Sequence, residues 1–224
     1  SSNGKVEFFV GTEKKTVRMN RLHLENDAGK LIHEGGDTLV DLNRAGSPLM
    51  EMVTEADFRT PEEIVGFLKE LQKILRTVGS SDADMEKGMM RCDVNISLRP
   101  KGQQEFGTKT ELKNMNSFTN IEKAVRAEIK RQQQLLEAGE KVVQETRGWD
   151  VEKEVSLPQR SKEEAADYRY FPEPDIPPLT IGAEDIAQLK AELPELPAAK
   201  LERFVAEYGL AWETAEIIAG DHEF

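Results

Sequence analysis

Residues 89–98 read MMRCDVNISL, and the alternation within this segment indicates the fold class of the chain. Its even positions are apolar, while its odd positions from Arg91 to Ser97 are polar. Because side chains along a β-strand point alternately to its two faces, the pattern predicts a strand with one apolar and one polar face. Further strands are predicted at 5–10, 15–25, 38–43, 49–54, 107–115 and 142–150.

Two amphipathic helices are predicted between these strands. The first, over 60–78, begins at a capping box formed by Thr60 and Glu63. The second, over about 119–138, begins at a similar box with Thr119 as its N-cap. Strands joined by short turns and interrupted by two helices predict an α+β fold, in which the helices cover one face of an antiparallel sheet.

The composition excludes several classes of protein. Of the 224 residues, 38% are hydrophobic, which is enough for a packed core and argues against a disordered chain. No uncharged apolar run approaches the length of a membrane span. A single cysteine, Cys92, excludes a disulfide framework and indicates a reducing cytoplasm. The net charge of −12 argues against general electrostatic binding of nucleic acid by this chain alone.

The charge is unevenly distributed along the chain. Residues 184–224 carry ten acidic side chains against three basic ones, and this shift predicts a domain boundary near residue 180. We therefore expect a first domain over 1–180 and the start of a helical domain over 181–224. The opening residues lack an initiator Met, which we interpret as the edge of a fragment whose N-terminal part is missing. Short helices are predicted at 183–193, at 197–208 and from about Ala211.

The polar faces of the predicted strands carry residues that suggest chemistry. Strict alternation groups Val17, Met19, Arg21, His23 and Glu25 on one face; Lys109, Glu111 and Lys113 on another; Asp93 and Asn95 on a third; and Glu145 and Arg147 on a fourth. Glu51 lies alone among apolar neighbours in 49–54. A sheet whose outer face lies in water is the simpler interpretation. Short side chains such as Asp93, Asn95 and His23 favour a more specific role, because they fix geometry.

A bound cation would account for the carboxylates. If Glu25, Glu51 and Glu111 converge, they cannot all stay ionised without a compensating positive charge. A hard divalent ion such as Mg²⁺ suits these oxygen ligands, and neighbouring Lys and Arg side chains would then meet phosphate oxygens. This combination is typical of phosphoryl transfer, which depends on positioning and charge neutralisation.

Other chemistries have weaker support. The sequence contains no GxxxxGK[ST] or GxGxxG segment, which argues against a P-loop or a dinucleotide site. His23 and His33 lack the ligand spacing of a zinc site. Cys92 falls on the apolar face of its predicted strand, which indicates a buried structural thiol rather than a nucleophile.

Six segments of the chain resemble the B subunits of tRNA-dependent aspartyl/glutamyl-tRNA amidotransferases. They occur in the order of that family across about residues 17–180, so chance similarity is a poor explanation. The segments are LHLENDAGK (22–30), LVDLNRAGSPLMEMV (39–53), RCDVNIS (91–97), GTKTELKNMNSF (107–118), QETR (144–147) and DYRYFPEPD (167–175).

The resemblance implies an ATP-dependent, kinase-like ligase subunit whose cradle fold is similar to the catalytic domain of glutamine synthetase. In that family, the side-chain carboxylate of Glu on mischarged tRNA(Gln), or of Asp on tRNA(Asn), is activated as an acyl phosphate with ATP and Mg²⁺. Ammonia released from glutamine by an amidase-like A subunit displaces the phosphate, and a small C subunit clamps the two together. The resemblance also implies that mischarged tRNA is bound mainly by a C-terminal region that this chain lacks.

Matching motifs imply roles for individual residues. The candidate Mg²⁺ ligands are Glu25, Glu51 and Glu111, and the candidate catalytic residues are Glu51, Glu111 and Lys113. The candidate nucleotide contacts are Arg91, Asp93, Asn95, Lys109 and Arg147. The chain departs from the family pattern at Asn26, where a second Glu is common, and it lacks an N-terminal Glu-x-His element of the metal site.

Two other functions stay open on the sequence alone. A non-catalytic scaffold would hold the amidase and the tRNA, and its polar residues would then be separate and hydrated. A free-standing carboxylate–amine ligase would carry out the same chemistry without a partner subunit.

Overall fold

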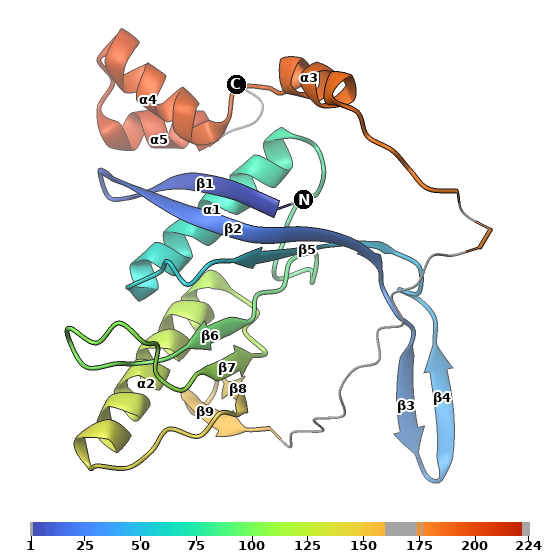
Figure 1. Ribbon diagram of the computed structural model, residues 1–224, viewed down its shortest axis with the longest axis vertical. Coiled ribbons are helices and arrows are strands. Elements are labelled where there is room, and N and C mark those ends of the chain that lie inside the picture. Colours follow the sequence, from blue (N-terminus) through green and yellow to red (C-terminus); the bar gives the residue numbers. More distant parts are fainter. Residues whose placement is uncertain (1, 160–173, 176, 221–224) are drawn as a thin grey trace. The chain divides into compact units, whose positions relative to one another are not determined.

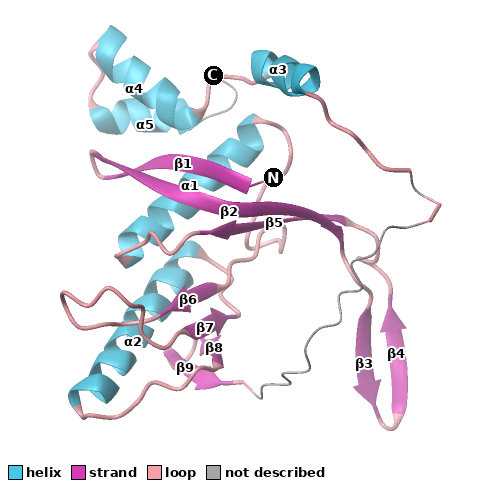
Figure 2. Cartoon of the chain, viewed as in Figure 1, coloured by secondary structure: helices cyan, strands magenta, loops and turns pink. Residues whose placement is uncertain are grey.

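The computed structural model describes residues 2–159, 174–175 and 177–220 (Figures 1 and 2). It divides into two compact units, Ser1–Phe67 and Leu68–Phe224. The domain boundary predicted near residue 180 stays a prediction. The four prolines of 168–179 predict an irregular segment; residues 168–173 and 176 of it lie outside the described residues, and the rest contains no helix or strand.

The first unit is built on an antiparallel sheet in the order β1-β2-β5. Its strands are β1 (Ser2–Val10), β2 (Glu13–Asn26) and β5 (Pro48–Thr54), and β1 and β2 are joined by a tight turn in which Gly11 has a positive φ of 58°. The Gly-Thr-Glu-Lys segment 11–14 predicts a hairpin with a loop of three to five residues. The hairpin is confirmed, and its loop is shorter, since Val10 pairs directly with Glu13. A separate hairpin of β3 (Lys30–Glu34) and β4 (Asp37–Asp41) follows β2, and β3 was not predicted (Figure 2).

Helix α1 (Pro61–Thr77) begins at the predicted capping box. The Glu63 amide donates to the Thr60 hydroxyl, the Thr60 amide donates to the Glu63 carboxylate, and both distances are 3.3 Å. In the first unit, Phe67 meets the Phe8 ring of β1 edge-on with centroids 6.0 Å apart. Phe8 is 1% exposed, so the start of α1 covers the apolar side of the β1–β2 hairpin.

The second unit contains α1 from Leu68 onward, the sheet β6-β7-β8-β9 and the remaining helices. The strands are β6 (Val94–Ile96), β7 (Thr110–Lys113), β8 (Thr146–Asp150) and β9 (Val155–Pro158), of which β9 was not predicted. The expectation of an antiparallel sheet is wrong for one pair, because β7 and β8 run parallel. Helix α2 (Phe118–Glu137) makes the crossover that a parallel pair requires, and it packs on β6 and β9.

The helices were located well by the sequence, with one error in capping. The N-cap of α2 is Ser117, whose hydroxyl accepts a hydrogen bond from the Asn120 amide, so Thr119 is not the cap. The C-terminal helices match their predicted positions and are α3 (Ala183–Glu192), α4 (Pro197–Tyr208) and α5 (Trp212–Gly220). Among the residues that the structure describes, no helix is both long and apolar enough to cross a membrane.

Candidate functional site

The paired strands β2 and β5 bring several predicted site residues to one face of the first unit. His23 lies directly opposite Glu51, and Glu25 lies opposite Leu49. Directly opposed residues of an antiparallel pair share a face, so Glu25 and Glu51 are diagonal neighbours on it. The Cα atoms of such neighbours are typically about 7–8 Å apart. Arg21 lies on the same face and its Nη2 donates to the Glu51 Oε1 at 2.9 Å. Two of the three candidate metal ligands are therefore neighbours.

The face predicted for residues 17–25 needs a correction. Met19 pairs with Thr54 and Arg21 pairs with Val53, so the register between β2 and β5 shifts by one residue at Asn20. Such a β-bulge interrupts the alternation. Val17 and Met19 consequently lie on the apolar face, and the polar face carries only the residues after the bulge.

A second polar face lies on the sheet of the second unit. Asn95 of β6 pairs with Glu111 of β7, and Glu111 pairs with Thr146 of β8, so the three side chains form a row across three strands. The Thr146 hydroxyl donates to Glu111 Oε2 at 2.9 Å. Thr146 was not among the residues predicted for the site, although the segment QETR contains it.

Lys113 forms the basic part of this row. Its Nζ lies 2.7 Å from the Asp93 carboxylate and 3.3 Å from the Glu111 carboxylate. Partial burial alone would lower the pKa of Lys113, but the two carboxylates outweigh it and raise that pKa above its usual value. Lys113 is thus held as a cation that is already paired with two carboxylates of the protein.

Two further candidates, Arg91 and Lys109, lie in irregular segments just before the strands of this row. Arg91 and Asp93 precede β6, because the strand predicted at 89–98 is confined to Val94–Ile96. Lys109 comes directly before β7 and is exposed. Both basic side chains lie next to the strand ends that carry Asn95 and Glu111.

Arg147 does not belong to this exposed row. It is 9% exposed, and its guanidinium donates to the Ser156 hydroxyl at 2.8 Å, to the Ser156 carbonyl at 2.6 Å and to Glu145 at 2.5 Å. Glu145 and Arg147 do share a side, but it is the side covered by α2, where Arg147 lies 3.8 Å from the fully buried Glu128. These protein partners occupy the guanidinium, so its surroundings do not support the expected phosphate contact.

The third metal candidate lies in the other unit. Glu25 and Glu51 belong to Ser1–Phe67 and Glu111 to Leu68–Phe224, so a metal site shared by all three stays a prediction. Within residues 2–159, 174–175 and 177–220, no group of three or more His, Cys, Asp or Glu side chains is arranged to hold a metal ion.

Cys92 lies before β6 and is half-buried, so its predicted place on a buried strand face is wrong, although its surroundings still argue against a reactive thiol. Its thiol is free and lies 3.9 Å from the Asp93 carbonyl. Burial, with a smaller contribution from the Asp93 charge, raises the pKa of the Cys92 thiol to about 12. The reactive thiolate is therefore scarce at neutral pH, which argues against a nucleophilic role.

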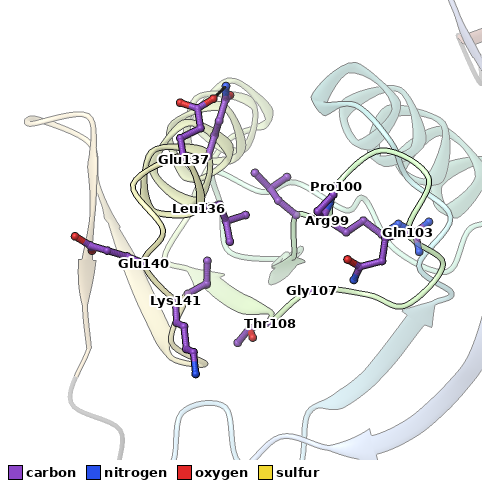
Figure 3. Close-up of a pocket in the computed structure, with 12 residues that line it drawn as sticks. Arg99, Pro100, Gln103, Gly107, Thr108, Leu136, Glu137, Glu140 and Lys141 are labelled. Atoms are coloured by element: carbon purple, nitrogen blue, oxygen red, sulfur yellow. Dashed lines mark hydrogen bonds between the residues drawn. The ribbon is translucent and has the colours of Figure 1, made fainter.

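A hollow of about 580 Å³ lies elsewhere in the second unit (Figure 3). It is formed between the segment that joins β6 to β7 and the end of α2. Leu98, Leu136 and Val142 contribute apolar surface to it, and charged side chains surround them. None of the candidate catalytic, metal-binding or nucleotide-contacting residues lines this hollow.

The fold and the two polar faces define an α+β domain with carboxylate, amide and lysine side chains on exposed strand surfaces. Comparison with protein families is more specific. The profile of the family described as the GatB/GatE catalytic domain matches residues 1–187, and the chain belongs to this family.

Curated relatives agree with the family assignment, and each of the following is named as the B subunit of aspartyl/glutamyl-tRNA(Asn/Gln) amidotransferase. The protein from Carboxydothermus hydrogenoformans is 51% identical over 223 residues, which cover 97% of this chain and 46% of the relative. The protein from Oleidesulfovibrio alaskensis is 51% identical, covering 99% and 47%, and that from Persephonella marina is 49% identical, covering 100% and 47%. The chain thus spans about half the length of the curated relatives it matches.

Proposed function

We propose that this chain is the catalytic part of the B component of an aspartyl/glutamyl-tRNA amidotransferase, with a glutamine-synthetase-like cradle. The family match over residues 1–187 carries this proposal. The protein would use ATP to phosphorylate the side-chain carboxylate of Glu on tRNA(Gln), or of Asp on tRNA(Asn). An amidase partner would supply ammonia from glutamine, and a small third component would hold the complex together.

The proposed reaction has two balanced steps. A carboxylate oxygen of the aminoacyl group takes the γ-phosphoryl group of ATP, which forms an acyl phosphate and releases ADP. Ammonia then attacks the carbonyl carbon, phosphate leaves with the bonding electrons and takes up the proton that the nitrogen loses, and an amide remains. Phosphorylation is needed because a carboxylate lacks a good leaving group. Catalysis of the first step rests mainly on positioning and on neutralising phosphate charge.

The donor chemistry of both polar faces fits a magnesium ion. Glu51 and Glu111 are partly exposed carboxylates, and each already lies beside a cationic side chain, Arg21 or Lys113. Glu25 is the diagonal neighbour of Glu51. We propose Glu25 and Glu51 on the first face, and Glu111 on the second, as Mg²⁺ ligands; an ion bound at either face would supply positive charge that screens the phosphates.

The basic and amide groups would bind the nucleotide and the transferred group. Lys113, kept protonated by Asp93 and Glu111, would contact phosphate oxygens together with Lys109 and Arg91. Asn95 and Asp93 would orient these groups through hydrogen bonds. Arg147 would act from inside the fold by supporting β8 and β9.

The test uses the full-length protein in complex with its amidase and C partners. ADP formation is measured with ATP, glutamine and Glu-tRNA(Gln) or Asp-tRNA(Asn), and the Glu51→Gln variant should lower turnover by about two orders of magnitude. Glu34→Gln, on the exposed β3–β4 hairpin, is the matched control and should leave turnover unchanged. Equal turnover in wild type and Glu51→Gln would favour a scaffold role, and full activity without the amidase would favour a free-standing ligase.

A further inference from the structure

The β-bulge in β2 contains one residue more than the strand ladder needs. Around it, Met19 pairs with Thr54 and Arg21 pairs with Val53, so Asn20 has no partner of its own on β5. Toward the other edge, β1 pairs with β2 in one continuous register, from Val10↔Glu13 to Ser2↔Arg21. The irregularity therefore belongs to the β2–β5 pairing alone.

The hydrophobic pattern skips the same residue. Before the bulge, apolar residues of β2 occupy odd positions, as at Val17, which is 2% exposed. After the bulge they occupy even positions, at the half-buried Leu22 and at Leu24, which is 74% exposed; these residues pair with Met52 and Met50. If Asn20 is omitted, the apolar residues alternate without interruption and every β2–β5 pair keeps its partner. On the β1 side, only the end of the ladder, at Ser2↔Arg21, would change.

Specific contacts hold the bulge in place. The Asn20 side-chain amide donates to the Glu55 carboxylate at 2.7 Å, and the Glu55 amide donates to the Arg18 carbonyl at 2.9 Å. The Arg18 guanidinium binds Asp57 through two hydrogen bonds of 2.9 and 2.6 Å. Glu55 and Asp57, which follow β5, thus bind β2 immediately before the bulge and at the bulge itself.

The bulge stands directly before the polar face. Arg21, which pairs with Glu51 through its guanidinium, is the next residue, and His23 and Glu25 follow on the same face. A bulge bends its strand, increases the local twist and changes the direction of the side chains beside it. The orientation of this polar segment relative to β5 is therefore set where the extra residue lies.

We propose that Asn20 is a positioning residue: as the extra residue of the bulge it sets the direction in which Arg21, His23 and Glu25 stand beside Glu51. Asn20 takes no part in the chemistry. The inference rests on the proposed function, because it assumes that these side chains serve the reaction. It explains why the strand keeps a residue that neither its pairing nor its core requires.

Deletion of Asn20 is the direct test, since it restores a regular ladder. The full-length protein with its partners should keep its thermal unfolding midpoint within a few degrees. Its kcat for ADP formation should fall by about tenfold or more, while KM for mischarged tRNA changes less than about threefold. Binding of Mn²⁺ to the full-length protein without its partners, measured by electron paramagnetic resonance, should weaken in parallel. Asn20→Ala keeps the extra residue and loses only the bond to Glu55, so it should retain more activity than the deletion.

The outcomes separate the two proposals. Unchanged kcat and Mn²⁺ binding after the deletion would show that the bulge positions nothing. Loss of folding in the deletion variant, with Asn20→Ala fully active, would show that the extra residue serves the fold, and would also overturn the inference. A wild-type complex that neither forms ADP nor binds Mn²⁺ would instead refute the proposed function, and the inference with it.

Discussion

The Glu70 carboxylate on α1 faces the Ala198 amide in the first turn of α4, and this amide opposes the rise that burial causes in the pKa of Glu70. The N-cap of α4, Leu196, provides no side-chain cap. Glu70 is 6% exposed, and its Oε1 has no hydrogen-bond partner among the described residues. Lys73 lies 4.0 Å from Glu70 and 3.9 Å from Glu216 of α5. These contacts join α1 to the C-terminal helices within the second unit.

Glu70→Gln should stabilise the protein at neutral pH. Burial, opposed in part by Lys73 and the Ala198 amide, raises the pKa of Glu70. A raised folded-state pKa means that ionisation of Glu70 costs stability as the pH rises through that pKa. The variant should therefore gain on the order of 1 kcal/mol in the free energy of unfolding at pH 7, and the gain should vanish below about pH 4.5. Urea unfolding across this pH range measures it, with the exposed Glu202→Gln as control. A destabilised Glu70→Gln at pH 7 would contradict this view.

Glu128→Ala should be among the most destabilising single changes in the second unit. Glu128 is fully buried, and its carboxylate accepts hydrogen bonds from Arg131 at 2.9 and 2.7 Å and from Gln132 at 2.8 Å. Removing one member of a buried ion pair costs about 3–5 kcal/mol, because its partner loses its compensation. Urea unfolding should show a loss of this order. The control is Glu122→Ala, whose exposed pair with Arg126 should contribute about 0.5 kcal/mol or less.

The same carboxylate predicts a response to acid. Burial alone would raise the pKa of Glu128, but hydrogen bonds from Arg131 and Gln132 outweigh it and lower that pKa. A depressed folded-state pKa contributes stability above the pKa of the unfolded chain, and this contribution is lost as the pH falls through the folded-state value. Wild type should therefore lose more stability than Glu128→Gln between about pH 5 and pH 3. Parallel stability curves for the two proteins would show that Glu128 does not titrate in this way.

Lys113→Gln should remove activity and leave the fold intact. Lys113 lies on the partly exposed face of β7, so its loss leaves no buried charge, and the change in unfolding free energy should stay below about 1 kcal/mol. Loss of a cation that stabilises the phosphoryl group during its transfer should lower turnover by a factor of about 10²–10³. The measurement is ADP formation by the complete complex, with Lys153→Gln, an exposed lysine near β9, as control. Near wild-type turnover in Lys113→Gln would exclude a role in phosphate binding.

Cys92 should resist alkylation in the folded protein. Because its pKa is raised to about 12, the thiolate is scarce at pH 8. Iodoacetamide labelling of native protein should be at least about tenfold slower than labelling in urea, where the thiol regains its ordinary pKa of about 8.5. Equal rates in the two states would show an accessible, reactive thiol.

Local signals in the sequence predicted the helices because those signals act over a few residues. The Thr60–Glu63 box, Pro197 at the start of α4 and Gly209 at its end, with φ of 64°, each satisfy backbone groups next to them in the chain. The error at α2 is also local. Ser117 and Thr119 are both acceptable N-caps, and the structure uses Ser117.

Strand partners and faces were harder to predict. The sequence contains a signal for the bulge, since the apolar residues of β2 change from odd to even positions at Asn20. The assumption of strict alternation along 15–25 overlooks this signal. For Arg147, the family motif QETR and its polar alternation both predict a phosphate contact. Alternation does not indicate which face α2 will cover, and α2 covers the face that carries Arg147.

The sequence by itself determined the α+β class, the positions of α1, α2 and the C-terminal helices, the family, and the chemical types of residue offered for a site. Only the tertiary structure decided that β7 and β8 run parallel, that Glu51 stands opposite His23 beside Arg21, and that Arg147 is enclosed with Glu128. The physical reason is the separation along the chain between the residues that interact. Capping and periodicity depend on neighbours within one or two turns, whereas strand register and the burial of a charge depend on segments that are distant in the chain and meet only in the packed protein.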